Sequence, residues 1–231
     1  MTAATVALGL IWFAAFLFST TLHEAAHALV AWRLGDPTAY HGGQVSLNPI
    51  PHIRREPFGM VIVPLLSYFA SPSHWMFGWA SAPYDPTWAA RHPRRAGAMA
   101  LAGPVANLLL VVLSGIGIRI GLATGAFQVP PDLTYGHLVQ AHGGGALGGL
   151  AALLSVFFSL NLILFLFNLL PLPPMDGSGV IQLLLPEEVS RRWQLVARQP
   201  LVGIIGILLA WRLFGLVLRP VFSFVLSMLL L

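Results

Sequence analysis

The residues best suited to chemistry form the run His23-Glu24-Ala25-Ala26-His27, which lies inside an apolar segment. In a helix each residue turns by about 100°, so His23 and His27 lie one turn apart on the same face. Two imidazoles so placed can supply two ligands of a tetrahedral zinc site, with Glu24 beside the metal as a general base. Ionisable side chains are costly in a bilayer and are usually functional there. The pattern therefore predicts a metal centre inside a membrane.

Asp176 is the best candidate for a third metal ligand. A carboxylate supplies a hard oxygen and leaves a fourth position for water. The chain has no cysteine, so any zinc site must use histidine and carboxylate. Three prolines shortly before Asp176 forbid a regular helix, and such backbone is tolerated in a membrane where protein or a water-filled cavity surrounds it. The alternative is a simple turn, because Pro, Asp and Gly are turn formers.

The composition is that of a polytopic membrane protein. The 231 residues are 57% hydrophobic and 9% charged, which predicts one membrane-embedded domain over residues 1–231 and leaves no room for a separate soluble domain. The net charge of +4 comes from twelve arginines and no lysine. Because these arginines cluster between apolar stretches, they indicate membrane topology, and no nucleic-acid partner is expected.

Four apolar stretches are long enough to cross a lipid bilayer as helices, namely residues 4–34, 96–122, 147–170 and 201–231. A fifth stretch, residues 58–70, is too short to cross comfortably, so we expect a re-entrant or membrane-surface segment. All loop arginine clusters then fall on one side, as the positive-inside rule requires. The predicted fold is all-α, with about four full spans and both termini outside.

Two further features complete the predicted fold. Residues 40–48 are Gly-rich and alternate in polarity from Gln44 to Leu47, which favours a small β-hairpin or strand. Asn107 lies in the apolar 96–122 stretch, where we expect it to form a hydrogen bond across helices.

Three motifs carry a resemblance to a known family. They are His23-Glu24-x-x-His27, Ala102-Gly103-Pro104-x-x-Asn107 and Asn168-x-x-Pro171-x-x-x-x-Asp176-Gly177. In this order, on separate apolar segments, they resemble the signatures of the site-2 protease family of intramembrane zinc metalloproteases (peptidase family M50). Gly35-Asp36-Pro37-Thr38 and Phe77-Gly78-Trp79-Ala80 further resemble the small bacterial members without a PDZ or CBS domain. The resemblance covers about residues 10–185, and residues 200–231 add a C-terminal membrane segment. Ser81-Ala82-Pro83 departs from the Lys-Pro-Val of those members.

The resemblance implies a set of site residues. His23, His27 and Asp176 would hold one Zn²⁺ per chain, and Glu24 would be the general base and proton shuttle. Zinc lowers the pKa of water towards about 7, and Glu24 would take the proton and later protonate the leaving amine. Asn168 would orient the substrate or stabilise the oxyanion, whereas the alternative is a helix-terminal hydrogen bond.

The predicted activity is that of an intramembrane zinc endopeptidase, which hydrolyses peptide bonds of transmembrane helices in regulated intramembrane proteolysis. The helix must unwind first, and the 40–48 strand could bind it by strand addition. One alternative is a non-catalytic membrane adaptor, which would not need Glu24. Another is a metal-ion transporter, which more often shows repeated halves with paired polar interruptions.

The location and partners follow from the same features. His27 lies six residues before Arg33, roughly 9 Å along a helix. We therefore expect an integral protein of the bacterial cell membrane with its active site nearer the cytoplasmic side. The partners expected are the lipid bilayer, a transmembrane helical substrate and, as in similar enzymes, a regulatory membrane protein.

Overall fold

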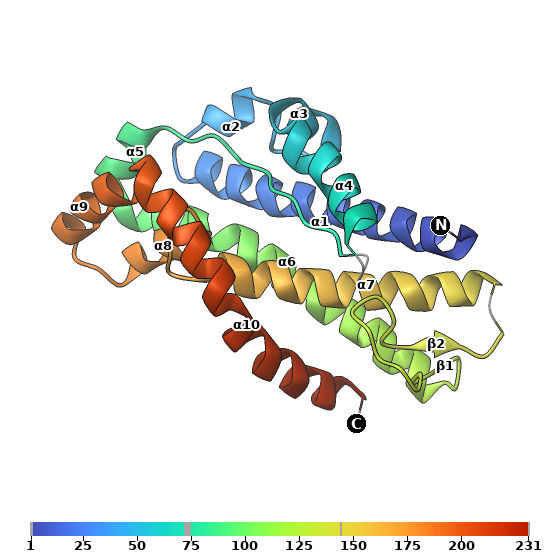
Figure 1. The fold of residues 1–231 in the computed structure, drawn as a ribbon. Helices are drawn as coiled ribbons and strands as arrows, with labels where there is room; N and C mark the ends of the chain where they lie inside the picture. Colours follow the sequence, from blue (N-terminus) through green and yellow to red (C-terminus); the bar gives the residue numbers. More distant parts are fainter. Residues whose placement is uncertain (1, 72–74, 144, 231) are drawn as a thin grey trace.

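The computed structural model describes residues 2–71, 75–143 and 145–230, which form a bundle of long helices (Figure 1). Within these residues, four helices are long and apolar enough to cross a membrane: α1 (Ala3–Arg33), α6 (Pro93–Ala123), α7 (Gly145–Asn168) and α10 (Pro200–Leu230). A helix of 31 residues, such as α1, is about 46 Å long and exceeds the ~30 Å hydrocarbon layer. The four predicted spans and the all-α fold class are confirmed.

Helix α6 is the centre of the bundle, since it packs against both α1 and α7. Its buried residues near the N-terminal end are small, and small side chains let neighbouring backbones approach closely: Gly103 lies against His23 and His27 of α1, and Gly97 lies against Leu183. Helix α10 runs diagonally across the bundle (Figure 1). In its apolar 18-residue stretch only 17% is buried, whereas the share is 33–50% in the other three helices. The outer face of α10 is therefore the most exposed apolar surface among these four helices.

The region after α1 contains short helices: α2 (Thr38–His41), α3 (Pro49–Arg55), the π-helical turn η1 (Phe58–Ile62) and α4 (Val63–Ala70). Phe58–Ala70 is a shorter apolar helical stretch beside α1, where the Tyr68 hydroxyl donates to the Thr5 carbonyl at 2.9 Å. Its length agrees with the expectation that this segment is not a full span.

The strand predicted at residues 40–48 was wrong. Tyr40 and His41 end the helical turn α2, Gly43 turns the chain at φ +73°, and Asn48 caps α3 by accepting from the Ile50 amide at 3.0 Å. An alternating run of four residues forms a strand only when a second strand satisfies its backbone groups. The small two-stranded antiparallel sheet lies instead between α6 and α7, where β1 (Phe127–Gln128) pairs with β2 (Gln140–Ala141).

The remaining helical elements pack against α6, at the end of the molecule where α1 ends (Figure 1). They are α5 (Pro86–Arg91), α8 (Asp176–Val180), the 3-10 turn η2 (Ile181–Leu183) and α9 (Glu187–Ala197). An extended segment, residues 75–85, connects the α4 side of the molecule with α5. Its Gly78 lies against η1, and a Cβ there would stand 2.2 Å from the Gly59 carbonyl oxygen, so only glycine fits.

Candidate metal centre

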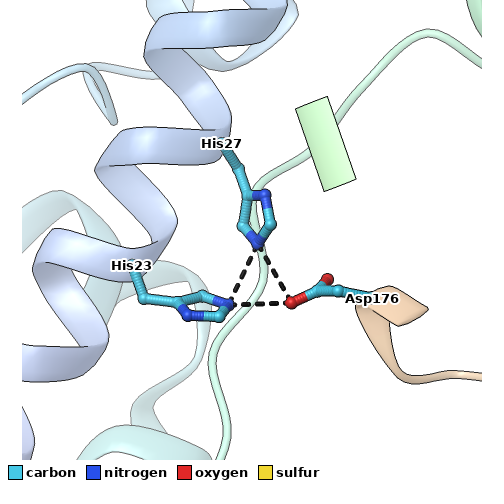
Figure 2. Close-up of side chains that lie close together, drawn as sticks. All are labelled: His23, His27 and Asp176. Carbon is cyan, nitrogen blue, oxygen red and sulfur yellow. Dashed lines mark hydrogen bonds and ion pairs between the residues drawn. The ribbon is translucent and has the colours of Figure 1, made fainter. Parts of the chain in front are cut away.

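Three predicted metal ligands meet at one point in the bundle (Figure 2). His23 and His27 project from successive turns of α1, and their Nε2 atoms are 3.0 Å apart. Asp176, the first residue of α8, places Oδ2 3.0 Å from His23 Nε2 and 3.3 Å from His27 Nε2. Both histidines are buried and Asp176 is half-buried.

The donor set and its spacing fit a zinc ion. Zinc binds histidine nitrogen and carboxylate oxygen at about 2.0–2.2 Å, so neighbouring ligands of a tetrahedral site lie roughly 3.3–3.6 Å apart. The three observed separations of 3.0, 3.0 and 3.3 Å approach this range. Three protein ligands are also the usual number in catalytic zinc sites, which keep a fourth position open.

Hydrogen bonds on the far side of each imidazole fix its tautomer. His27 Nδ1 lies 2.7 Å from the Met99 carbonyl oxygen, and His23 Nδ1 lies 2.5 Å from Asn107 Oδ1. Because both oxygens can only accept, each Nδ1–H donates, which leaves the Nε2 lone pairs directed at the common point. This orientation of metal-binding histidines by an outer partner is the general pattern in metalloproteins.

A buried chain of amides supports His23. Asn107 Nδ2 donates to Asn161 Oδ1 at 2.8 Å, and Asn161 Nδ2 donates to Ser19 Oγ at 2.9 Å and to the Phe157 carbonyl at 2.8 Å. The predicted cross-helix bond of Asn107 is confirmed, and its partners include a candidate metal ligand. The sequence analysis missed Asn161, although an amide side chain in the middle of an apolar helix was a signal.

The structure gives a reason for the glycine in the motif Ala102-Gly103-Pro104-x-x-Asn107. A Cβ at this position would stand 2.3 Å from His27 Nε2 and 2.5 Å from His23 Nε2. The backbone of α6 thus passes directly against the metal centre, and Asn107 follows one turn later on the same face. The motif Ala102-Gly103-Pro104-x-x-Asn107 therefore supplies both the space for the imidazoles and the acceptor that orients one of them.

The backbone around Asp176 is equally constrained. After α7 ends at Asn168, the chain turns through the prolines, and a Cβ at Gly177 would stand 2.3 Å from the Leu169 carbonyl oxygen. The third motif thus folds the chain back so that Asp176 faces α1. Asn168 itself is half-buried at the end of α7 and is not among the described residues that line the cavity beside the metal centre.

Glu24 lines this cavity together with His27 and Asp176. The cavity has a volume of about 260 Å³, and Glu24 is 7% exposed. Its walls come from the extended segment (Ala80, Ser81, Ala82, Tyr84), from α5 and α6 (Ala89, Ala96, Met99, Ala100), and from the region of Asp176 and α9 (Pro174, Met175, Ser178, Gly179, Gln182, Gln194, Arg198). The cavity therefore brings Glu24 next to two of the candidate metal ligands.

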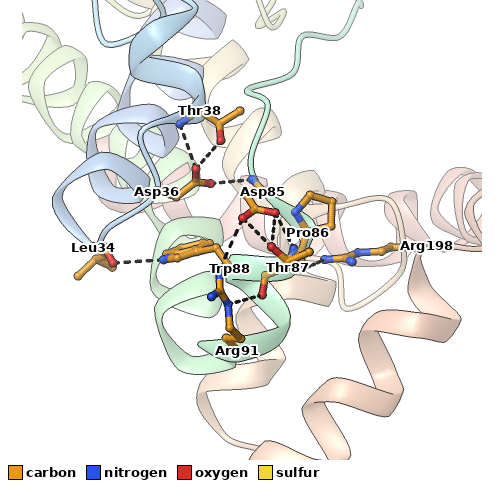
Figure 3. Close-up of polar contacts among 9 residues, drawn as sticks. All are labelled: Leu34, Asp36, Thr38, Asp85, Pro86, Thr87, Trp88, Arg91 and Arg198. Atoms are coloured by element: carbon orange, nitrogen blue, oxygen red, sulfur yellow. Dashed lines mark hydrogen bonds and ion pairs between the residues drawn. The ribbon is translucent and has the colours of Figure 1, made fainter.

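The wall formed by the extended segment is fastened at two places. Ser81 donates to Glu56 Oε1 at 2.6 Å and its carbonyl accepts from Gln44 Nε2 at 3.2 Å. At the end of the segment, the buried Asp36 carboxylate accepts from the Asp85 amide at 2.8 Å and from the Thr38 amide at 3.0 Å (Figure 3). Asp36 thereby ties the wall to the C-terminal end of α1, a role that the sequence motif around it did not disclose.

Four apolar helices in the described residues, a His-His-Asp cluster and an adjacent glutamate define an integral membrane protein with a metal-dependent hydrolytic site. Comparison with known proteins agrees with this class. The chain belongs to peptidase family M50, whose model matches residues 11–213.

Two relatives illustrate the family membership. "Putative zinc metalloprotease YwhC" of Bacillus subtilis is 36% identical over 177 residues, which are 76% of this chain and 69% of that protein. "Putative zinc metalloprotease Rip2" of Mycolicibacterium smegmatis is 32% identical over 181 residues, which are 77% of this chain and 58% of that protein. No solved structure matches the chain.

Proposed function

We propose that this protein is a zinc endopeptidase that hydrolyses peptide bonds of transmembrane helices. His23, His27 and Asp176 hold one Zn²⁺, and Glu24 is the general base. The observation that carries the proposal is the convergence of three ligand atoms from positions as far as 153 residues apart, beside a cavity that Glu24 lines. The names of the relatives, which describe zinc metalloproteases, support the same activity.

The residues divide the chemistry between them. Bound zinc supplies a Lewis acid that polarises a carbonyl and lowers the pKa of water. Glu24 takes a proton from the water that attacks the peptide carbonyl carbon, and it delivers that proton to the amine nitrogen when the C–N bond breaks. Asn107 and the Met99 carbonyl keep both imidazoles in the tautomer that this chemistry requires.

The cavity favours an extended peptide over a helix. A transmembrane helix hides its peptide groups in hydrogen bonds, so the substrate unwinds locally before cleavage. Among the described residues, the amides of Ala80 and Ala82 have no hydrogen-bond partner, and both residues line the cavity. An unwound substrate can pair with them as an added strand. We also propose that Asn168 orients the substrate, and the Asn168→Ala variant tests this role.

The arrangement also supports a location and a domain organisation. Arginines lie on α5 and α9 and in the first turn of α6, in the half of the molecule that contains the C-terminal end of α1 (Figure 1), and Arg95 Nη1 donates to the Leu34 carbonyl there at 3.2 Å. By the positive-inside rule, this half faces the cytoplasm, the active site lies nearer that side, and both termini lie outside. We infer that the chain forms one domain in the bacterial cell membrane, with the catalytic core at about residues 10–185. We also infer that a second membrane protein regulates it.

The decisive experiment compares the wild type with Glu24→Gln. Both proteins are purified with zinc, their zinc content is measured, and each is given a single-span substrate that contains helix-weakening residues. We expect cleavage by the wild type only, with equal zinc in both. Equal cleavage by both would refute the role of Glu24. Zinc without cleavage by either, on a panel of such substrates, would favour the non-catalytic adaptor, and zinc flux into vesicles would favour the transporter.

A further inference from the structure

A second cavity adjoins the metal-centre cavity. Its volume is about 180 Å³, and it shares with the first cavity the residues Tyr84, Pro174, Ser178, Gly179, Gln182, Gln194 and Arg198. The remaining lining residues are Pro173, Trp193 and Ala197. A peptide bound at the metal centre can therefore continue into this space without leaving the protein.

Arg198 gives the second cavity its charge. It is the one ionised residue among the described residues that line it, and it has no carboxylate partner in the described part of the chain. On the same helix, Arg191 and Arg192 pair with Glu187 at 3.5 Å and Glu188 at 3.6 Å. Within the described residues, the Arg198 side chain makes one hydrogen bond, a long one from Nη2 to the Pro86 carbonyl at 3.4 Å (Figure 3).

Neighbouring contacts hold Arg198 at the cavity. Its guanidinium lies over the Tyr84 ring, 5.8 Å from the centroid. Helix α9 is fastened to the Asp176 region by Trp193 Nε1, which donates to the Ser178 carbonyl at 2.8 Å. Gln194 Nε2 donates to the Ala89 carbonyl at 3.0 Å and to Gln182 Oε1 at 2.5 Å. Arg198 therefore follows a helix that is hydrogen-bonded to the segment that carries Asp176, a candidate metal ligand.

Gln194 adds an independent sign of a ligand. The residue is 6% exposed, and its Oε1 is buried without a hydrogen-bond partner. A buried acceptor without a donor is destabilising, so such atoms are uncommon unless something else satisfies them. Gln194 lines the cavity, and a turn of its buried amide towards this space would let Oε1 accept a peptide N–H. The cavity thus offers a cation and an acceptor, which match a carboxylate side chain and its backbone amide.

We propose that the second cavity is a subsite for an acidic residue of the peptide substrate. Arg198 pairs with the aspartate or glutamate carboxylate, and Gln194 Oε1 accepts a backbone N–H. An extended peptide advances about 3.3 Å per residue, and a space of this size spans roughly two or three residues, which sets the distance from the cleaved bond. Since acidic side chains avoid the bilayer centre, cleavage would fall near the membrane surface. This proposal rests on the proposed protease function.

The test uses substrates that differ at one position. Single-span substrates carry Asp, Asn or Lys in turn at each of about four residues on either side of the cleaved bond, and kcat/KM is measured for each. For the wild type we expect a preference of roughly five- to tenfold for Asp over Asn at one position. Arg198→Glu should reverse this preference towards Lys, whereas Arg192→Gln should leave the Asp-to-Asn ratio unchanged and Arg198→Gln should abolish it.

A binding measurement separates this proposal from the protease function. Labelled peptides with Asp or Asn at the preferred position are titrated against the Glu24→Gln protein, with and without Arg198→Gln. Tighter binding of the Asp peptide, lost with Arg198→Gln, supports the subsite even if no variant cleaves anything. Cleavage of all substrates at equal rates, or equal binding of both peptides, would overturn the subsite and leave the protease function standing.

Discussion

Replacing Gly103 with alanine would put a methyl group into the metal centre. The new Cβ would stand 2.3 Å from His27 Nε2 and 2.5 Å from His23 Nε2, whereas ordinary van der Waals contact begins at 3.4 Å. The difference means that an imidazole or the whole of α6 must move by about 1.1 Å. Metal–ligand distances tolerate only about ±0.2 Å.

Neither imidazole can move away without losing another contact. His27 Nδ1 donates to the Met99 carbonyl on α6, and His23 Nδ1 donates to Asn107, also on α6. A ring that retreats from the new methyl group therefore breaks the bond that orients it. Because loss of one such outer bond typically costs 10–100-fold in metal affinity, we expect Gly103→Ala to weaken zinc binding by at least about 100-fold.

The assay is a zinc competition titration with a chelator of known affinity, together with the zinc content of the protein as purified. Gly115→Ala is the matched control, because it lies on the same helix and its Cβ would meet Phe158 Cε2 at 3.4 Å, an ordinary contact. This control should fold and bind zinc as the wild type does. Wild-type zinc affinity in a folded Gly103→Ala protein would refute the proposed metal centre.

Three further predictions concern Asn107, Asn168 and Asp85. Asn107→Ala should lower zinc affinity about 10–100-fold, measured by the same titration, because His23 loses the acceptor that fixes its tautomer; unchanged affinity would contradict this role. Asn168→Ala should lower kcat while zinc content stays constant, as expected of a group that orients substrate, and an unchanged kcat would leave it a structural residue. Hydrogen bonds from Thr87 hold the pKa of Asp85, which caps α5, below its ordinary value of 3.8. The stabilising contribution of the ionised carboxylate is therefore present above pH 3.8 and lost as the pH falls through the lowered pKa. Because asparagine also caps helices, the Tm difference between wild type and Asp85→Asn reports this charge and should shrink on acidification; a constant difference would contradict stabilisation by the ionised carboxylate.

The site and its surroundings differ in how far the sequence could predict them. The ligand pair was predictable because the spacing of His23 and His27 needs only the period of one helix. Asp176 was predictable from residue type and from resemblance to a family, but nothing local states that it faces α1. The prediction of a strand at residues 40–48 was wrong because the alternation of polar and apolar residues does not show whether a second strand is there to pair with it.

The sequence by itself determined the spans, because a run of apolar residues long enough for the bilayer has few alternatives to a buried helix. It also determined one face of the metal centre, within a single turn of α1. Only the tertiary structure decided that Gly103 lies against the imidazoles, that Asn161 supports Asn107, and that Arg198 lines the cavity beside the metal centre. These are contacts between helices far apart in the chain, and they depend on how side-chain shapes fit when the helices pack, which no local period encodes.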